Sequence, residues 1–272
     1  MSWNTGTARI MGDGLPVCRS RAATVAAMEW WEALLLVAGG GFAGVINTVA
    51  GGGSTITVPL LVLAGVPGNS ANGSNRVGIL ASTVAAAASF HRLGVKGLTH
   101  AAPILLPVLL GSFVGSVGIS RLTDDAFETV FGLVMIPLIL LSIRKPEFRT
   151  DGAQWSPVVV AIVFFGIGIY AGAIQAGVGL VLLAALTRAG LDLVTANHVK
   201  VLVNVAVTVV ALPVFVVQGK VDWLPALVLA GGFTVGGWLG AHATVKGGER
   251  LIRTVMVLAS VALAAKLLGL FG

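Results

Sequence analysis

Long apolar blocks dominate this chain and leave it few ways to fold. Most of them reach about 17–25 residues, the length that a helix needs to cross a hydrocarbon core of about 30 Å. They run without the polar–apolar alternation of barrel strands. The sequence therefore predicts an all-α, polytopic membrane protein of about ten helical segments, two of them short or broken. The segments are 29–50, 52–66, 73–91, 99–119, 125–143, 156–176, 177–190, 195–217, 223–243 and 250–270.

The composition agrees with this class. The chain is 56% hydrophobic and 10% charged, whereas a soluble domain carries about 25% charged residues. A net charge of +6 would indicate nucleic-acid binding in a soluble protein, but here the basic residues are scattered among short loops, which favours a role in membrane orientation. No nucleic-acid partner is expected. Because Cys18 is the only cysteine, no intrachain disulfide can form, and no metal site or cofactor is predicted.

Lysine and arginine set the expected orientation. If the N-terminus is outside and all ten segments cross, nine basic residues fall at inner loops and four at outer ends. The positive-inside rule then places both termini outside the cytoplasm. The inner residues are Arg92, Lys96, Arg144, Lys145, Arg149, Arg188, Lys246, Arg250 and Arg253, and the outer ones are Arg76, Arg121, Lys220 and Lys266.

Residues 1–28 form a polar N-terminal tail, with Arg9, Arg19 and Arg21 on the outer side of this topology. Two interpretations stay open: a flexible tail, or a start-site artefact with Met28 as the first residue. A cleaved signal peptide is disfavoured, because the first apolar block belongs to a repeat and is expected to stay in the protein.

The two halves of the chain resemble each other at a displacement of about 125 residues. "FAGVIN" (42–47) matches "YAGAIQ" (170–175), "AGGG" (50–53) matches "AGVG" (176–179), and "SAN" (70–72) matches "TAN" (195–197). The matches predict two transmembrane repeats, 29–145 and 155–270, with five segments each. An odd number of segments makes the second repeat sit upside down relative to the first, a common build of secondary transporters with a site at the midplane.

A glycine-rich break interrupts each repeat at a matching place. In the first, the helix restarting at Ser54 would have its N-terminus inside the membrane, where free amides and the helix dipole favour an anion. The alternative is that the glycines only permit a sharp turn or close packing. The candidate binding residues are Gly51, Gly52, Gly53, Ser54 and Thr55 at the first break, and Gly177 and Gly179 at the second, which lacks the hydroxyl side chains of the first.

Two basic residues follow the breaks at matching positions, Arg76 and Lys200. A charge inside the membrane is costly and marks a pathway, and two such cations suit a dianion or a sulfonate head. The alternative is that both side chains snorkel to the surface. Asn75 and Asn204 are candidate neutral donors, and His198 is a candidate carrier of a coupling proton, with a satisfied interfacial histidine as the alternative. The coupling ion, proton or sodium, is not indicated, since no carboxylate lies securely in mid-membrane.

Four stretches carry a resemblance to a known family: "AGVINTVAGGGSTITVPLLVLAGVP", "SANGSNRVGIL", "RLGVKG" and "TANHVKVLVNVAVTVVALPVFVVQGKVDW". Over residues 29–270 the chain resembles the sulfite exporter TauE/SafE family. The resemblance implies a multi-pass protein of the bacterial inner membrane with an internal duplication. It also implies export of small sulfur-containing anions, such as sulfite, sulfoacetate or other organosulfonates. The second half departs from the first by having "AGVGL" where "AGGGST" stands.

The leading hypothesis is a secondary transporter that exports such an anion by alternating access, with its site between the repeats. An anion channel with the same site is one alternative. A membrane-embedded enzyme is another, and it is disfavoured because Ser54 has no histidine or carboxylate near it in sequence to activate it. The chain is therefore expected not to be an enzyme.

Overall fold

The computed structural model describes residues 28–143 and 155–267, and within them every regular element is a helix. The last helix turns at Gly248, where φ is 54° and ψ is −152°, so its two arms complete the ten predicted segments. The predicted all-α architecture is confirmed. The helices are α1 (Trp30–Val49), α2 (Ser54–Leu63), α3 (Gly68–Arg92), α4 (Leu98–Ser120), α5 (Asp124–Ile143), α6 (Pro157–Ala173), α7 (Val178–Arg188), α8 (Leu193–Val217) and α9 (Trp223–Leu267).

Some sequence predictions lie outside the described residues. They concern the tail before Met28 and the loop residues Arg144, Lys145 and Arg149. The side chains of Arg253 and Lys266 are not described either.

Four of the described helices are long and apolar enough to cross a membrane: α1, α4, α8 and the first arm of α9, Trp223–Gly248. Helix α3 has the same length as α8, 25 residues, but it carries many polar side chains. These are buried because α3 packs between α8 and α9. A polar helix at the centre and apolar helices around it are what a polytopic membrane protein requires, since polar groups must be satisfied away from lipid.

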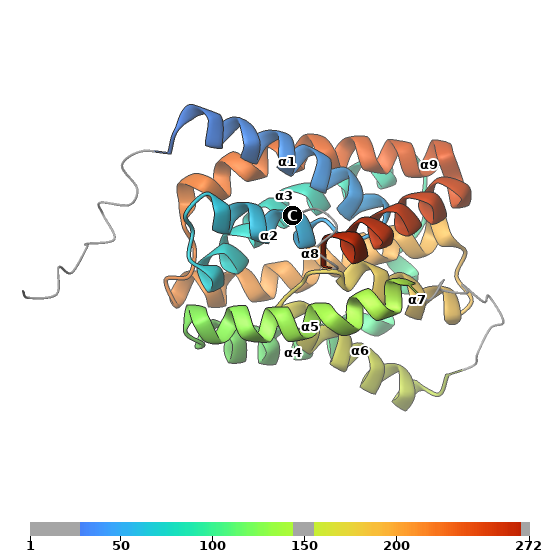
Figure 1. Cartoon of the computed structure of the whole chain (residues 1–272). Coiled ribbons are helices and arrows are strands. Elements are labelled where there is room, and N and C mark those ends of the chain that lie inside the picture. The colour runs from blue at the N-terminus through green and yellow to red at the C-terminus, as the bar shows by residue number, and fades with distance from the viewer. Residues whose placement is uncertain (1–27, 144–154, 268–272) are drawn as a thin grey trace, which may run out of the picture.

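The two short segments turn back instead of crossing (Figure 1). Gly53, at the start of α2, faces the carbonyl of Ala43, and Leu60 further along α2 reaches back to Gly39. Helix α2 therefore runs antiparallel to α1 and ends at the side where α1 began. Helices α6 and α7 form the corresponding hairpin from the opposite side. A hairpin adds no net crossing, so each half keeps an odd number of through-running helices, and the loops stay on the sides expected from the sequence.

The first helix of each half packs against the other half. Helix α1 lies parallel to the first arm of α9, where a Cβ on Gly40 would lie 2.6 Å from the carbonyl oxygen of Leu229. Helix α6 lies parallel to α4 in the same way, with 2.0 Å between a Cβ on Gly115 and the carbonyl oxygen of Ile169. Only glycine permits such backbone approach, as expected of small residues between membrane helices.

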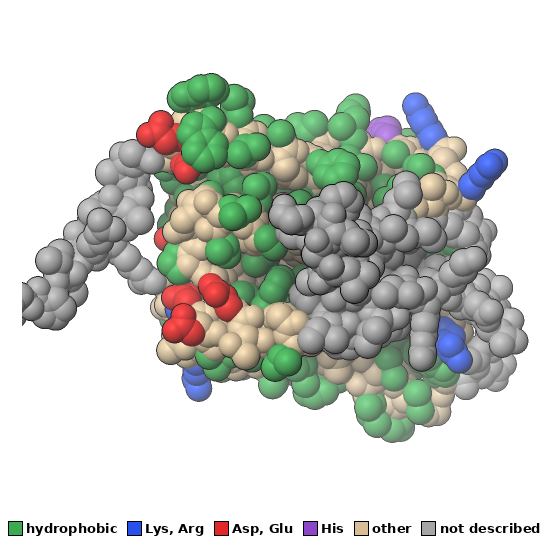
Figure 2. Space-filling model, viewed as in Figure 1, with side chains coloured by type: hydrophobic (Ala, Val, Ile, Leu, Met, Phe, Trp, Pro, Cys, Tyr) green, Lys and Arg blue, Asp and Glu red, His purple; other side chains and the backbone are tan. Residues whose placement is uncertain are grey.

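The two ends of the bundle differ in charge. We call the end at which α1 begins the N-terminal end; it also holds the turns 64–67, 121–123 and 218–222. Figure 2 shows acidic side chains gathered at this end, on the left, and most basic ones at the opposite end. The acidic residues are Glu29, Glu32, Asp124, Asp125, Glu128 and Asp222; the basic residues of the opposite end are Arg92, Lys96, Arg188, Lys246 and Arg250.

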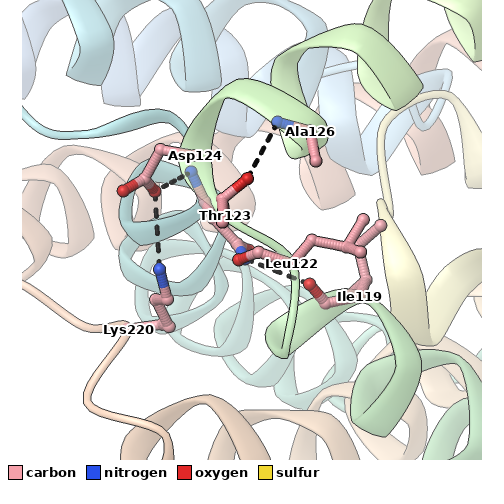
Figure 3. A network of polar contacts seen from close by, with 7 residues as sticks. Ile119, Leu122, Thr123, Asp124, Ala126 and Lys220 are labelled. Atoms are coloured by element: carbon pink, nitrogen blue, oxygen red, sulfur yellow. Dashed lines mark hydrogen bonds and ion pairs between the residues drawn. The ribbon is translucent and has the colours of Figure 1, made fainter.

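A polar network ties three turns together at the N-terminal end (Figure 3). The Asp124 carboxylate accepts a hydrogen bond of 3.0 Å from the amide of Asn69 and forms an ion pair of 3.6 Å with Lys220. The side-chain amide of Asn69 donates to the carbonyl oxygens of Ile119 and Leu122. The start of α3 is thereby fixed to the α4–α5 and α8–α9 turns.

Candidate functional site

The two helix breaks meet in the middle of the bundle. The amide of Gly179 donates to the carbonyl oxygen of Gly51 over 3.3 Å. Gly51 has a φ of 88°, and Gly177 caps α7 with a φ of 71°, values that favour glycine. A Cβ on Gly51 would lie 2.2 Å from the Cα of Gly179. Non-helical backbone at membrane depth is thus covered by protein, as it must be in lipid.

The first turn of α2 is polar on its buried side. Thr55 donates its hydroxyl to the carbonyl oxygen of Gly52 over 2.6 Å, and Thr57 donates to Oδ1 of Asn75 over 2.5 Å. The hydroxyl of Ser54, 1% exposed, has no hydrogen-bond partner among the described residues. Gly52 is buried, yet a Cβ built on it would meet no atom within 4 Å. The first break therefore contains unfilled space beside unpaired polar groups.

Arg76 lies fully buried on α3 and reaches the C-terminus of α6. Its guanidinium also stacks over the ring of Phe215, 4.5 Å from the centroid. Carbonyls at a helix C-terminus carry partial negative charge, so the cation caps α6 favourably. The four hydrogen bonds of its terminal nitrogens go to the carbonyl oxygens of Ala171 (3.3 Å), Gly172 (2.5 Å) and Ala173 (3.0 Å) and to Oε1 of Gln175 (3.2 Å).

Lys200 makes the corresponding contact from the other half. It lies fully buried on α8, and its ammonium donates to the carbonyl oxygens of Asn47 (3.0 Å) and Thr48 (2.7 Å) at the C-terminus of α1. Neither Lys200 nor Arg76 forms an ion pair with a carboxylate of the described residues. Both side chains point into the bundle, so the alternative in which they snorkel to the surface does not hold.

The structure separates His198 from the breaks. Its ring stacks on Phe90 with centroids 5.2 Å apart, and its Nδ1 lies 2.8 Å from where a Cβ of Gly97 would be. The histidine thus packs the start of α8 against the α3–α4 turn at the opposite end. Asn204 lies one turn beyond Lys200, is 3% exposed, and its Oδ1 has no partner in the described chain.

Two residues of the site were not among the sequence candidates, Asn47 and Gln175. Gln175 has a φ of 60°, accepts from Arg76 (3.2 Å) and donates through Nε2 to the hydroxyl of Thr208 (2.8 Å). Asn47 is 4% exposed, and its Nδ2 is unpaired within the described residues. The signal was present in the matched stretches "FAGVIN" and "YAGAIQ", which both end in a side-chain amide just before the break.

The two breaks together offer two buried positive charges, the unpaired donors Nδ2 of Asn47 and Oγ of Ser54, and the amide end of α2. These groups favour a bound anion, whereas the unpaired Oδ1 of Asn204 is an acceptor and does not. Within residues 28–143 and 155–267 no group of three or more His, Cys, Asp or Glu side chains could hold a metal ion.

Comparisons with known proteins point to one family. A family model described as "Sulfite exporter TauE/SafE" matches residues 36–267. The chain is 29% identical to the probable membrane transporter protein ORF9 of Sinorhizobium sp over 232 residues, 84% of this chain and 88% of the relative.

Two further relatives have similar coverage. A probable membrane transporter protein of Haemophilus influenzae is 28% identical over 83% of this chain and 90% of its own length. The probable membrane transporter protein YfcA of Escherichia coli K12 is 26% identical over 83% of this chain and 86% of its own length. No solved structure matches the chain.

Proposed function

The chain belongs to the sulfite exporter TauE/SafE family, and from this premise we propose that it is a secondary transporter that exports a small sulfur-containing anion, such as sulfite or sulfoacetate. That it is a membrane transporter agrees with the names of its relatives. The anion, the direction and the mechanism are our proposal.

One observation carries the proposal. Arg76 and Lys200 are both 0% exposed. Arg76 lies at the second break and Lys200 at the first, and neither has a carboxylate partner in the described chain. Burying two charges without a counter-charge is costly, even when helix carbonyls accept their hydrogen bonds. An anion bound at the breaks would offset part of that cost, and the cost returns when the anion leaves. A transporter needs this balance, because its site must both take up and release the anion.

The proposed cycle is alternating access between two halves of opposite orientation. Helices α1 and α6 begin at opposite ends of the bundle, and each packs into the other half. Such an arrangement supports rocking of one half against the other around a fixed central site. The proposed site residues are those of the breaks (Gly51, Gly52, Gly53, Ser54, Thr55, Gly177 and Gly179) together with Asn75, Arg76, Lys200 and Asn204; His198 is retained as a proton carrier at the opposite end.

We further propose a location in the bacterial inner membrane with the N-terminal end outside. The acidic N-terminal end and the basic opposite end (Figure 2) support this orientation under the positive-inside rule.

Flux measurements in proteoliposomes test the proposal. Purified protein should move labelled sulfite or a sulfonate with saturable kinetics, and protein-free vesicles should not. A conductance in planar bilayers without saturation would favour the channel alternative. Absence of flux for every sulfur oxyanion would overturn the proposed substrate class.

A further inference from the structure

We infer that the anion site is one-sided: the anion is held at the first break, by Lys200, Asn47, Ser54 and Asn75 around the open space beside Gly52, while the second break is closed. The inference rests on the proposed function and narrows it. It differs from the symmetric site that the repeat predicts, in which both cations bind the anion.

The second break has little capacity left for a ligand. A guanidinium has five N–H donors. The four on the terminal nitrogens of Arg76 all meet carbonyl or amide oxygens, and its Nε alone lacks a partner among the described residues. A sulfonate would need this planar fork for bidentate binding, but backbone carbonyls occupy it. Both ends of the Gln175 amide are paired as well, with Arg76 and Thr208. Arg76 is therefore a clamp that holds the α6 terminus to α3.

The first break keeps unused donors. An ammonium has three donors, and Lys200 spends two of them on carbonyls of α1. Nδ2 of Asn47 and Nδ2 of Asn75 have no partner among the described residues, and neither has the hydroxyl of Ser54. Buried donors without partners are rare in native structures. A small oxyanion would supply acceptors for all of them.

These groups lie around one turn of the chain. The Cβ of Asn47 is 2.8 Å from the position that a Cβ of Gly53 would take. The Asn75 amide accepts from Thr57, whose hydroxyl also faces the carbonyl oxygen of Gly53. Since the Lys200 ammonium contacts the backbone of Asn47 itself, the charge and the amides border the same break.

Three differences between the halves explain the asymmetry. At the first break the amide side chain is shorter by one methylene than at the second, the cation is a lysine with fewer donors than an arginine, and a serine hydroxyl stands where the second break has an apolar leucine. Each change leaves a polar group unused at the first break, whereas at the second break Arg76 and Gln175 leave only the Nε of Arg76 without a partner among the described residues. The corresponding pairs are Asn47 and Gln175, Lys200 and Arg76, and Ser54 and Leu180.

Gly52 lies beside the open space proposed for the anion, and replacing it with alanine tests the proposal. It is buried, and a Cβ there would meet nothing within 4 Å. Its φ is not in the left-handed region, so alanine fits the backbone. The added methyl would occupy the space proposed for an anion oxygen. One ammonium, two amides and one hydroxyl at the same break suit a compact oxyanion head such as sulfite or a sulfonate.

The experiment compares ligand-induced thermal shifts of purified variants with sulfite and with sulfoacetate. A ligand that binds the folded form raises Tm by mass action. Gly52→Ala should keep the ligand-free Tm and weaken anion binding at least about tenfold. The matched control is Gly231→Ala, at an exposed helical glycine with equally open space, which should keep both. Lys200→Gln should lose the shift, and Arg76→Lys should lower the ligand-free Tm, because it removes the fork that holds the α6 terminus.

The outcomes separate the two claims. If the wild type binds and Gly52→Ala binds equally well, the one-sided site is wrong and the transporter proposal stands. The same holds if Arg76→Lys loses the shift at an unchanged ligand-free Tm, because Arg76 would then be a ligand. If the wild type shows neither a shift nor flux with any sulfur oxyanion, the proposed function fails, and the site with it.

Discussion

The amide of Gly179 donates a hydrogen bond of 3.3 Å to the carbonyl oxygen of Gly51, so the two broken helices touch backbone to backbone. The contact joins residues that are far apart in sequence, one in each of the stretches "AGGG" and "AGVG" that the predicted repeat matches. It fixes the spacing of the two breaks and therefore of everything that surrounds them.

Gly51→Ala should destabilise the protein by at least about 3 kcal/mol, because the residue would combine a left-handed φ with overpacking against Gly179. The measurement is the ligand-free Tm and the monodisperse yield in detergent. Gly52→Ala is the adjacent control, since its Cβ meets open space. Equal Tm values for the two variants would contradict the contact.

Asp124→Ala should cost about 1 kcal/mol. The partly exposed ion pair with Lys220, 3.6 Å long, contributes little, and most of the loss comes from the hydrogen bond to the Asn69 amide. Asp125→Ala, at the exposed neighbouring position, is the control and should change Tm by less. If high salt lowered the wild-type Tm to that of Asp124→Ala, the ion pair would be the larger contribution and the argument wrong.

Asp192 should make stability sensitive to acid. Burial opposes its ionisation, but hydrogen bonds from Thr195 and Val194 outweigh burial and hold its pKa below the usual value. A lowered pKa means that the cap stabilises the folded state at neutral pH and is lost as pH falls through the folded pKa. Asp192→Ala should cost about 1 kcal/mol at pH 7.

Thermal unfolding of the wild type, Asp192→Ala and Asp192→Asn across pH checks this. Asparagine caps without titrating, so the wild type should approach the alanine variant in acid while the asparagine variant does not. A constant gap between wild type and alanine down to about pH 3 would contradict the assignment.

Single cysteines should report the orientation. In a background with Cys18→Ser, Gln218→Cys at the N-terminal end should react with a membrane-impermeant maleimide in intact cells. Lys96→Cys, in the turn at the opposite end, should react only after permeabilisation. The reverse pattern would place the basic end outside, against the positive-inside rule.

The sequence by itself determined the helical class, the number of segments and the places where two of them break. Lipid leaves the backbone no partner but itself, so apolar blocks of this length must be helices and glycine runs inside them must be covered breaks. Arg76 and Lys200 stood out for a related reason, because a charge inside the membrane is costly and has to face the interior of the bundle.

Only the tertiary structure decided what these groups touch. Arg76 reaches a carbonyl 96 positions away and Lys200 one 152 positions away, and no local pattern specifies such contacts. In the folded chain the short segments form hairpins, His198 lies at the end opposite the N-terminal end, and Asn47 and Gln175 lie at the breaks. The apolar pattern along the chain encodes the helices. The partners of their polar side chains follow from how the helices pack, so a difference of one methylene (Asn47 and Gln175) or of donor number (Lys200 and Arg76) decides which polar group stays unpaired.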